Sequence, residues 1–237
     1  MVRSEVLFSV DIEGKLIEQK RLLRNLLSSQ PLCFNLFGEL KLNLPLASAA
    51  FRQVTNGRLD SVTTIEFEWS PGRQNPKYTN DGSAFDVYIK GKTATEGNAF
   101  IGIEVKYHEN LRNKVDVKQE KLDRYFEIAD KMDCFRMGCC SQYTKAPVHQ
   151  IWRDHLLAGI HRIVDSFDDG FFVFLYPKDN NYCSRAAASY GQCLTSDDTF
   201  SAWTLEDVVS AIRDHSSDPW IDQFYDRYLN FSKLESL

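Results

Sequence analysis

The sequence lacks the long apolar runs and the leader pattern that would place a chain in or across a membrane. No stretch approaches the roughly 20 apolar residues that a membrane-spanning helix requires, so no membrane partner is expected. The first residues, MVRSEVLFSVDIEGK, contain no basic segment followed by a long apolar one, which gives no indication of a secretory signal. We therefore expect a cytoplasmic protein.

The sequence also lacks the usual metal-binding spacings of cysteine and histidine. Six cysteines and five histidines are present, but none forms a C-x-x-C or an H-x-x-x-H pattern. Cys139 and Cys140 are adjacent, which is a poor spacing for a zinc knuckle. No structural zinc site is expected, and without a secretory signal the cysteines are expected to be reduced thiols.

An excess of positive charge is absent as well. The 237 residues include 28 Lys and Arg against 33 Asp and Glu, for a net charge of −5, so total charge does not indicate nucleic-acid binding. Internal repeats, low-complexity segments and Pro/Gly-rich linkers are missing too. We expect a single domain over 1–237, with a helical N-terminal part over 1–58 and an α/β core with C-terminal helices over 59–237.

Helical periodicity dominates the N-terminal part, where leucines recur every three or four residues. Pro31 suits the first turn of a helix, because its missing N–H is not needed there. The predicted helices of this part cover 11–29, 31–40 and 46–55.

From Val62 the apolar period changes to 2, which predicts strands. The three predicted strands cover 62–69, 84–90 and 100–107. The polar loop SPGRQNPKYTNDGS is longer than usual, and long ordered loops are often functional. Gly91 and Gly97 indicate a hairpin connection between the last two strands.

The C-terminal half continues the alternation of helices and strands. FFVFLYP, at 171–177, is a continuous apolar run and predicts a strand buried on both faces. The predicted helices cover 116–131, 147–166, 180–194, 204–214 and 218–231. Helices, three strands, a helix and then a buried strand make a mixed α/β plan.

Strand alternation brings three polar side chains together in the second and third predicted strands. Glu104 and Lys106 are two residues apart and share a face, and Asp86 lies opposite the apolar face of its own strand. If the two strands pair as a hairpin, Asp86 and Glu104 converge. The apolar faces carry Phe85, Val87 and Ile89 in one strand and Ile103, Val105 and Tyr107 in the other.

Two neighbouring carboxylates repel each other, and a divalent cation relieves that repulsion. Oxygen ligands favour Mg²⁺, for which Mn²⁺ substitutes, over zinc. A lysine beside such a cation helps to orient and deprotonate water, and together these parts can hydrolyse a phosphodiester. The alternative is an ordinary charge pair, because E-x-K is common on solvent-facing strands. The arrangement of Asp86 and the E-x-K on successive strands makes the catalytic interpretation as strong as the charge-pair alternative, and both stay open at this point.

The pattern of Asp86 with Glu104-Val105-Lys106 resembles the PD-(D/E)XK nuclease superfamily. Longer blocks resemble a bacterial branch of restriction-endonuclease-like proteins across about 15–230. These blocks are SSQPLCFNLFGEL, FEWSPGR, SAFDVYI, FIGIEVKYHE, RYFEIADKMDCF and QIWRDHLLAG. The resemblance implies a restriction-endonuclease-like core, with a central mixed sheet, helices on both faces and a metal site at the edge of the sheet.

The resemblance implies roles for individual residues. Asp86 and Glu104 would be metal ligands, the backbone carbonyl of Val105 would be a third, and Lys106 would activate the water. The nominal proline before the aspartate is replaced by Phe85, a departure that is frequent in the superfamily.

Three further residues are candidate accessory groups. Many members place a carboxylate on the N-terminal helix, which makes Glu39 a candidate, although a solvated helix-end glutamate is an equal interpretation. Glu68 could reach the metal, but we favour a surface acid. Gln119 follows the E-x-K strand, where many relatives use a glutamine, yet its spacing to Tyr125 is longer than the usual Q-x-x-x-Y.

The candidate nucleic-acid contacts surround these residues. Arg73 and Lys77 lie in the long polar loop, and His108 follows the E-x-K strand. Arg124 and Tyr125 either contact phosphate or pack their helix. Further cations that could line the site are Lys90, Lys92, Arg112, Lys114, Lys118 and Lys121. Acidic residues are interleaved with these cations, so an ordinary mixed-charge surface is the alternative. The sequence contains no helix-turn-helix, zinc-finger or RNA-binding motif that would recognise a base sequence.

These observations predict a Mg²⁺-dependent nuclease that acts on DNA rather than RNA and as an endonuclease rather than an exonuclease. A role in defence against foreign DNA rests on the resemblance alone. Two alternatives stay open: a nuclease-fold protein that binds nucleic acid or a partner without cleaving it, and an oligomeric scaffold. A homodimer is a candidate assembly, because one site cuts one strand.

Overall fold

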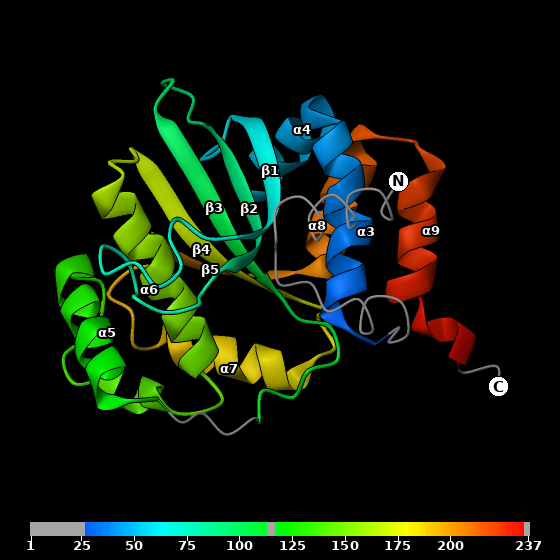
Figure 1. Ribbon diagram of the computed structural model, residues 1–237. Helices are drawn as coiled ribbons and strands as arrows, with labels where there is room; N and C mark the ends of the chain where they lie inside the picture. The colour runs from blue at the N-terminus through cyan, green and yellow to red at the C-terminus, as the bar shows by residue number, and fades with distance from the viewer. Residues whose placement is uncertain (1–26, 113–116, 235–237) are drawn as a thin grey trace.

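The computed structural model describes residues 27–112 and 117–234, which form a mixed five-stranded sheet with helices on both faces (Figure 1). The strand order is β1-β2-β3-β4-β5. β1, β2 and β3 are antiparallel neighbours, whereas β4 pairs in parallel with both β3 and β5. The strands are β1 (Ser61–Trp69), β2 (Phe85–Lys92), β3 (Asn98–Val105), β4 (Asp169–Tyr176) and β5 (Phe200–Thr204). The predicted mixed α/β plan is confirmed.

Two groups of helices cover the two faces of the sheet (Figure 1). The first group is α3 (Ser29–Leu42), α4 (Leu44–Val54), α8 (Leu205–His215) and α9 (Pro219–Tyr228). The second group is α5 (Gln119–Met132), α6 (His149–Val164) and α7 (Asn181–Gly191). Two short 3-10 turns are η1 (Cys140–Thr144) and η2 (Phe231–Leu234). Each group buries its own apolar core against the sheet.

β4 lies at the centre of both cores, as its continuous apolar run predicts. Phe171 and Val173 pack toward the first group of helices, whereas Phe172 and Phe174 pack toward the second. All four side chains are buried. Helices cover this strand on both faces, so its residues are apolar at successive positions instead of alternating between apolar and polar.

Side-chain caps fix where several helices begin. Ser28 accepts a hydrogen bond from the Gln30 N–H at the start of α3, and Asn43 accepts one from Leu46 at the start of α4. Thr204 accepts one from Asp207 at the start of α8. Each cap satisfies a backbone donor that the helix itself cannot pair.

Two element predictions differ from the structure. Most of the helix predicted over 11–29 lies outside the described residues, and its end is a turn at Leu27 followed by the Ser28 cap of α3. β5 is an additional strand that the sequence analysis missed. Its segment FSAWT is only five residues long and owes its extended form to parallel pairing with β4.

The expectation that all six cysteines are reduced thiols is wrong for one pair. Cys139 and Cys193 form a disulfide, with Cα atoms 5.7 Å apart. The backbone brings them together, because the Arg136 N–H donates to the Cys193 carbonyl at 2.8 Å. The two cysteines are 54 residues apart in sequence, so spacing alone could not indicate the pair.

Within 27–112 and 117–234, no helix is long and apolar enough to cross a membrane.

Candidate active site

The β2–β3 hairpin brings the predicted acidic residues together. Val87 pairs with Ile103, and continuing this antiparallel register by one residue places Asp86 opposite Glu104. The backbone N–H of Val105 donates to Oδ2 of Asp86 at 2.8 Å, so the carboxylate is anchored to the neighbouring strand. β3 ends at Val105, and the Lys106 N–H continues onto β4 by donating to the Leu175 carbonyl at 2.8 Å.

Glu104 and Lys106 share one face of β3, as alternation predicts, and their side chains form an ion pair. Both residues are buried, with exposed fractions of 4% and 7%. Ile103 and Val105 pack in the opposite core, which confirms the predicted division of faces.

One predicted face is wrong at the start of β2. Phe85 packs with the α5–α6–α7 side, whereas Val87 packs in the core beneath α3 and α4. The cause is local, because the Phe85 ring fills the space beside Gly102, where an added Cβ would lie 2.5 Å from it. Strict alternation therefore fails at the residue just before Asp86.

The charges of these residues alter one another's protonation. Burial and the negative charge of Glu104 raise the pKa of Asp86 well above its ordinary value, against the opposing charge of Lys106. Burial alone would lower the pKa of Lys106, but the charges of Glu104 and Asp86 outweigh it and raise that pKa. The site thus holds two crowded acids beside a persistent cation.

The donors of this site fit a hard divalent cation. Asp86 and Glu104 offer only oxygen atoms, and their mutual repulsion is visible in the raised pKa of Asp86. Mg²⁺ keeps several waters, so two carboxylates and the Val105 carbonyl are a sufficient set. Among the described residues, no cluster of three or more His, Cys, Asp or Glu side chains suits a metal. The candidate ligands are therefore those two carboxylates and one backbone oxygen.

The structure separates the three accessory candidates. Glu68 lies near the site, since its charge contributes to raising the pKa of Asp86. Its backbone is left-handed (φ 47°), and its side chain is 22% exposed and lies 3.5 Å from Arg73. Glu39 forms no hydrogen bond or ion pair with Asp86 or Glu104 in the described structure. The α3 residue that meets the site is Cys33, whose Sγ lies 3.9 Å from the Asp86 carbonyl oxygen.

Gln119 is exposed at the start of α5 and donates to Asp123 at 2.8 Å. Its place near the acidic pair is taken by a residue that the sequence analysis did not single out. Gln150 of α6 donates to Oε1 of Glu104, the same oxygen that Lys106 contacts. Gln150 opens the block QIWRDHLLAG, but nothing in the sequence shows which strand that helix face meets.

The candidate nucleic-acid contacts also divide into two groups. Arg124 donates to the backbone carbonyls of Tyr78 (2.8 Å) and Lys77 (3.0 Å), so it fastens the long loop to α5. Tyr125 is buried, and its hydroxyl donates to Asp81. These two residues follow the packing interpretation. Lys77 is exposed, and Arg73 reaches Glu68 at 3.5 Å.

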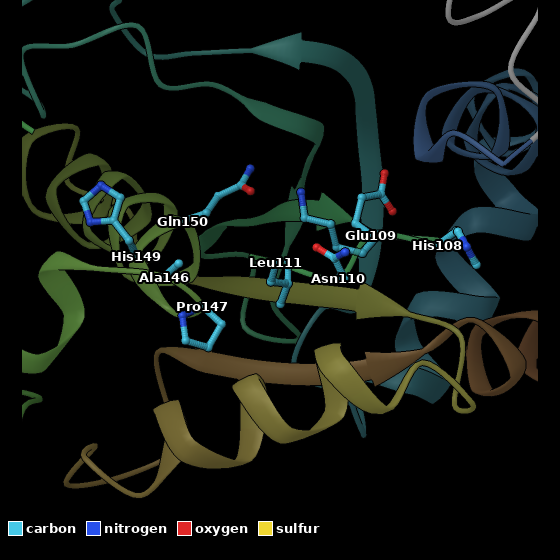
Figure 2. Close-up of a pocket in the computed structure, with 9 residues that line it drawn as sticks. His108, Glu109, Asn110, Leu111, Ala146, Pro147, His149 and Gln150 are labelled. Carbon is cyan, nitrogen blue, oxygen red and sulfur yellow. The ribbon is translucent and has the colours of Figure 1, made fainter. Parts of the chain in front are cut away.

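A pocket of about 270 Å³ opens beside Lys106. Figure 2 shows Gln150 and His149 on one side of it, with Glu109 and Asn110 across from them. His108 also lines this pocket, farther along the same segment. A second pocket shares His108 and Asn110 with it, and a third shares His149 and Gln150. The first pocket therefore adjoins the other two through these shared residues, and we call the three together the row of pockets.

Comparison with known proteins assigns the chain to a family. The family model described as the PD-(D/E)XK nuclease superfamily matches residues 1–230. Neither the comparison with curated proteins nor that with solved structures gave a match. The family model covers nearly the whole chain, and the structure has the mixed sheet with helices on both faces that the resemblance implies. The chain therefore belongs to the PD-(D/E)XK nuclease superfamily.

Proposed function

We propose that the protein is a metal-dependent nuclease that hydrolyses phosphodiester bonds in DNA. The observation that carries this proposal is the anchored acidic pair. Asp86 is bonded to the backbone N–H of Val105, next to a Glu104 that is paired with the buried Lys106. A surface charge pair would not be buried, nor would it sit beside a second carboxylate at the end of a hairpin.

Asp86, Glu104 and the Val105 carbonyl are the groups that would hold Mg²⁺ or Mn²⁺. Such a cation, when bound, supplies positive charge that polarises a phosphodiester and makes a water molecule more acidic. Lys106 places its ammonium group beside Glu104, where it orients the attacking water and offsets charge on the phosphate. Gln150 fixes the Glu104 carboxylate by donating to Oε1. The half-buried Glu109 lines the pocket and bonds the Tyr107 N–H at 2.6 Å, which steadies the segment after Lys106.

A cleavage assay tests the proposal. Supercoiled plasmid, linear duplex, single-stranded DNA and RNA are each incubated with Mg²⁺, Mn²⁺ or EDTA. We expect cutting of DNA that needs the metal and that falls by roughly 10²–10⁴-fold in Asp86→Asn and in Lys106→Met. Lys131→Met on α5 is the matched control, since the exposed Lys131 pairs with Glu127 of its own helix.

Wild-type protein that cuts no substrate with either metal would contradict the proposal. Cutting that persists in Asp86→Asn would contradict the assignment of the site. Conversion of plasmid to open circles shows an endonuclease, whereas loss of linear substrate alone shows an exonuclease. The role in defence and the homodimer remain parts of the proposal, and sedimentation with a duplex substrate tests the dimer.

A further inference from the structure

Arg153 is an arginine of α6 that the proposed chemistry does not use. It lies three residues after Gln150, on the same side of the helix, with Cβ atoms about 5–6 Å apart by helix geometry. Its Nε donates to Oδ1 of Asp154 at 3.1 Å. In the part of the chain that the structure describes, neither Nη group of Arg153 has a hydrogen-bond acceptor.

Asp154 holds this guanidinium in a fixed orientation. Its side chain is fully buried, and its Oδ2 has no hydrogen-bond partner among the described residues. Burial raises the pKa of Asp154 to about 7, and the positive charge of Arg153 opposes that rise. The Arg153 side chain is 31% exposed. One edge of the guanidinium is therefore tied to the core, and the other is left for a ligand.

The free edge borders the third pocket of the row, whose volume is about 750 Å³. Lys118 and Lys121 of the α5 end also line it, and His149 and Gln150 join it to the catalytic pocket. Among the described residues that line it, the one acid is Asp81. That carboxylate already accepts bonds from Thr79, Ser83 and Tyr125. The pocket is thus positively charged and adjoins Glu104 through Gln150.

We propose that this pocket binds a backbone phosphate of the substrate strand that flanks the scissile one, with Arg153 as its bidentate ligand. Two parallel N–H donors match two phosphate oxygens, which a lysine cannot do. Lys118 and Lys121 add charge at the mouth of the pocket. Asp154 is a positioning residue, because it reaches the phosphate only through Arg153. The inference rests on the proposed function, since the flanking phosphate belongs to the strand that is cut.

Equilibrium binding in EDTA tests the subsite without cleavage. The probes are a fluorescein-labelled single strand and the matching duplex, followed by anisotropy over a range of KCl. We expect Arg153→Gln to weaken binding by about 10-fold or more, as for the loss of charged hydrogen bonds. The slope of log K against log [KCl] should shrink by about 0.7–0.9, the value for one phosphate. Arg153→Lys should keep the slope and still lose affinity.

Arg162→Gln is the matched control, because Arg162 is on the same helix but bonds the Asp168 carbonyl at 3.1 Å, away from the pocket. Asp154→Asn, which keeps the shape, should lower affinity and leave the salt slope nearer to that of the wild type. Arg153→Gln leaves the buried Asp154 without its partner, so its thermal unfolding is measured as well. Lys118→Gln with Lys121→Gln gives a second test that does not touch the core, because Lys118 precedes α5 as its N-cap and Lys121 is partly exposed in the first turn.

Unchanged affinity and slope in both Arg153→Gln and the double lysine variant would overturn the inference. Absence of binding to either probe would do the same. If the wild-type protein cuts DNA but these substitutions leave DNA binding unchanged, the proposed function stands and only the subsite is overturned. Binding with an Arg153-dependent slope but without cutting by any metal supports the subsite and overturns the proposed nuclease.

Discussion

At the scale of single residues, Glu104 is the most constrained group of the site. One of its oxygens accepts from both Lys106 and Gln150, and the side chain is nearly excluded from solvent. Lys106 follows Glu104 by two residues, just after β3 ends, and Gln150 approaches from α6. Groups that orient a metal ligand in this way govern how tightly the metal is held.

Gln150→Leu should therefore lower the apparent affinity for Mg²⁺ more than it lowers the stability of the fold. We expect the Mg²⁺ concentration for half-maximal cleavage to rise by roughly 10–100-fold, as when a supporting hydrogen bond to a metal ligand is lost. The measurement is a Mg²⁺ titration of the cleavage rate. Gln142→Leu, at an exposed position on η1, is the control. An unchanged titration in Gln150→Leu would show that Glu104 does not need this donor.

At the scale of elements, the β2–β3 hairpin depends on a missing side chain. Gly102 faces the Phe85 ring, where an added Cβ would lie 2.5 Å from the nearest ring atom. Phe85 immediately precedes Asp86, so any movement of the ring moves the carboxylate. The hairpin thus couples core packing to the geometry of the acidic pair.

Gly102→Ala should cost both stability and activity. Overpacking of this kind lowers the free energy of unfolding by about 1–3 kcal/mol, and we expect the displaced Asp86 to reduce cleavage as well. Urea denaturation and the cleavage rate are measured together. Gly38→Ala in α3 is the control, because its added Cβ meets nothing within 4 Å. That change should stabilise the helix by about 0.5–1 kcal/mol. Equal behaviour of the two variants would disprove the coupling.

The hairpin also shows how far the sequence could predict the site. Asp86, Glu104 and Lys106 were predictable because alternation and an 18-residue separation act locally. Gln150 was not, since the apolar residues of its helix do not show which of its other positions meets β3. For Glu68, a left-handed backbone interrupts the period of β1, so alternation alone could not show whether its side chain reaches the site. β5 and the Cys139–Cys193 pair depend on contacts between distant segments, which leave no local pattern.

At the scale of the whole molecule, α6 joins the core to the site. Gln150 and Arg153 line the third pocket, and the same helix buries most of the surface of His149, His155 and His161. Burial lowers the pKa of all three histidines, and for His155 to about 3. An unfolded histidine titrates near 6.5. Below that pH the unfolded chain binds more protons, so these histidines make the fold less stable as the pH falls.

His155 gives a direct measure of this effect. Its Nδ1 pairs with the Tyr190 hydroxyl at 2.7 Å, so Tyr190→Phe is compared with Tyr190→Phe/His155→Phe. Between pH 7.5 and 5.5 the single variant should lose about 1 kcal/mol more of its free energy of unfolding than the double variant does. Both variants keep Asp154, whose raised pKa makes the fold more stable as the pH falls. Its contribution therefore cancels when the losses of the two variants are compared. Urea denaturation at the two pH values supplies the comparison, and parallel losses would contradict it.

The order of the strands carries a consequence for synthesis on the ribosome. β1, β2 and β3 follow one another directly and pair as neighbours, so both carboxylates of the site emerge within one hairpin. β4 can join β3 only after α5 and α6 have been made, and closing that larger loop costs more chain entropy. A nascent chain therefore acquires its acidic pair first. Gln150 and Arg153 are synthesised later, so an unfinished chain contains the candidate metal ligands before it contains the arginine proposed to bind the substrate strand.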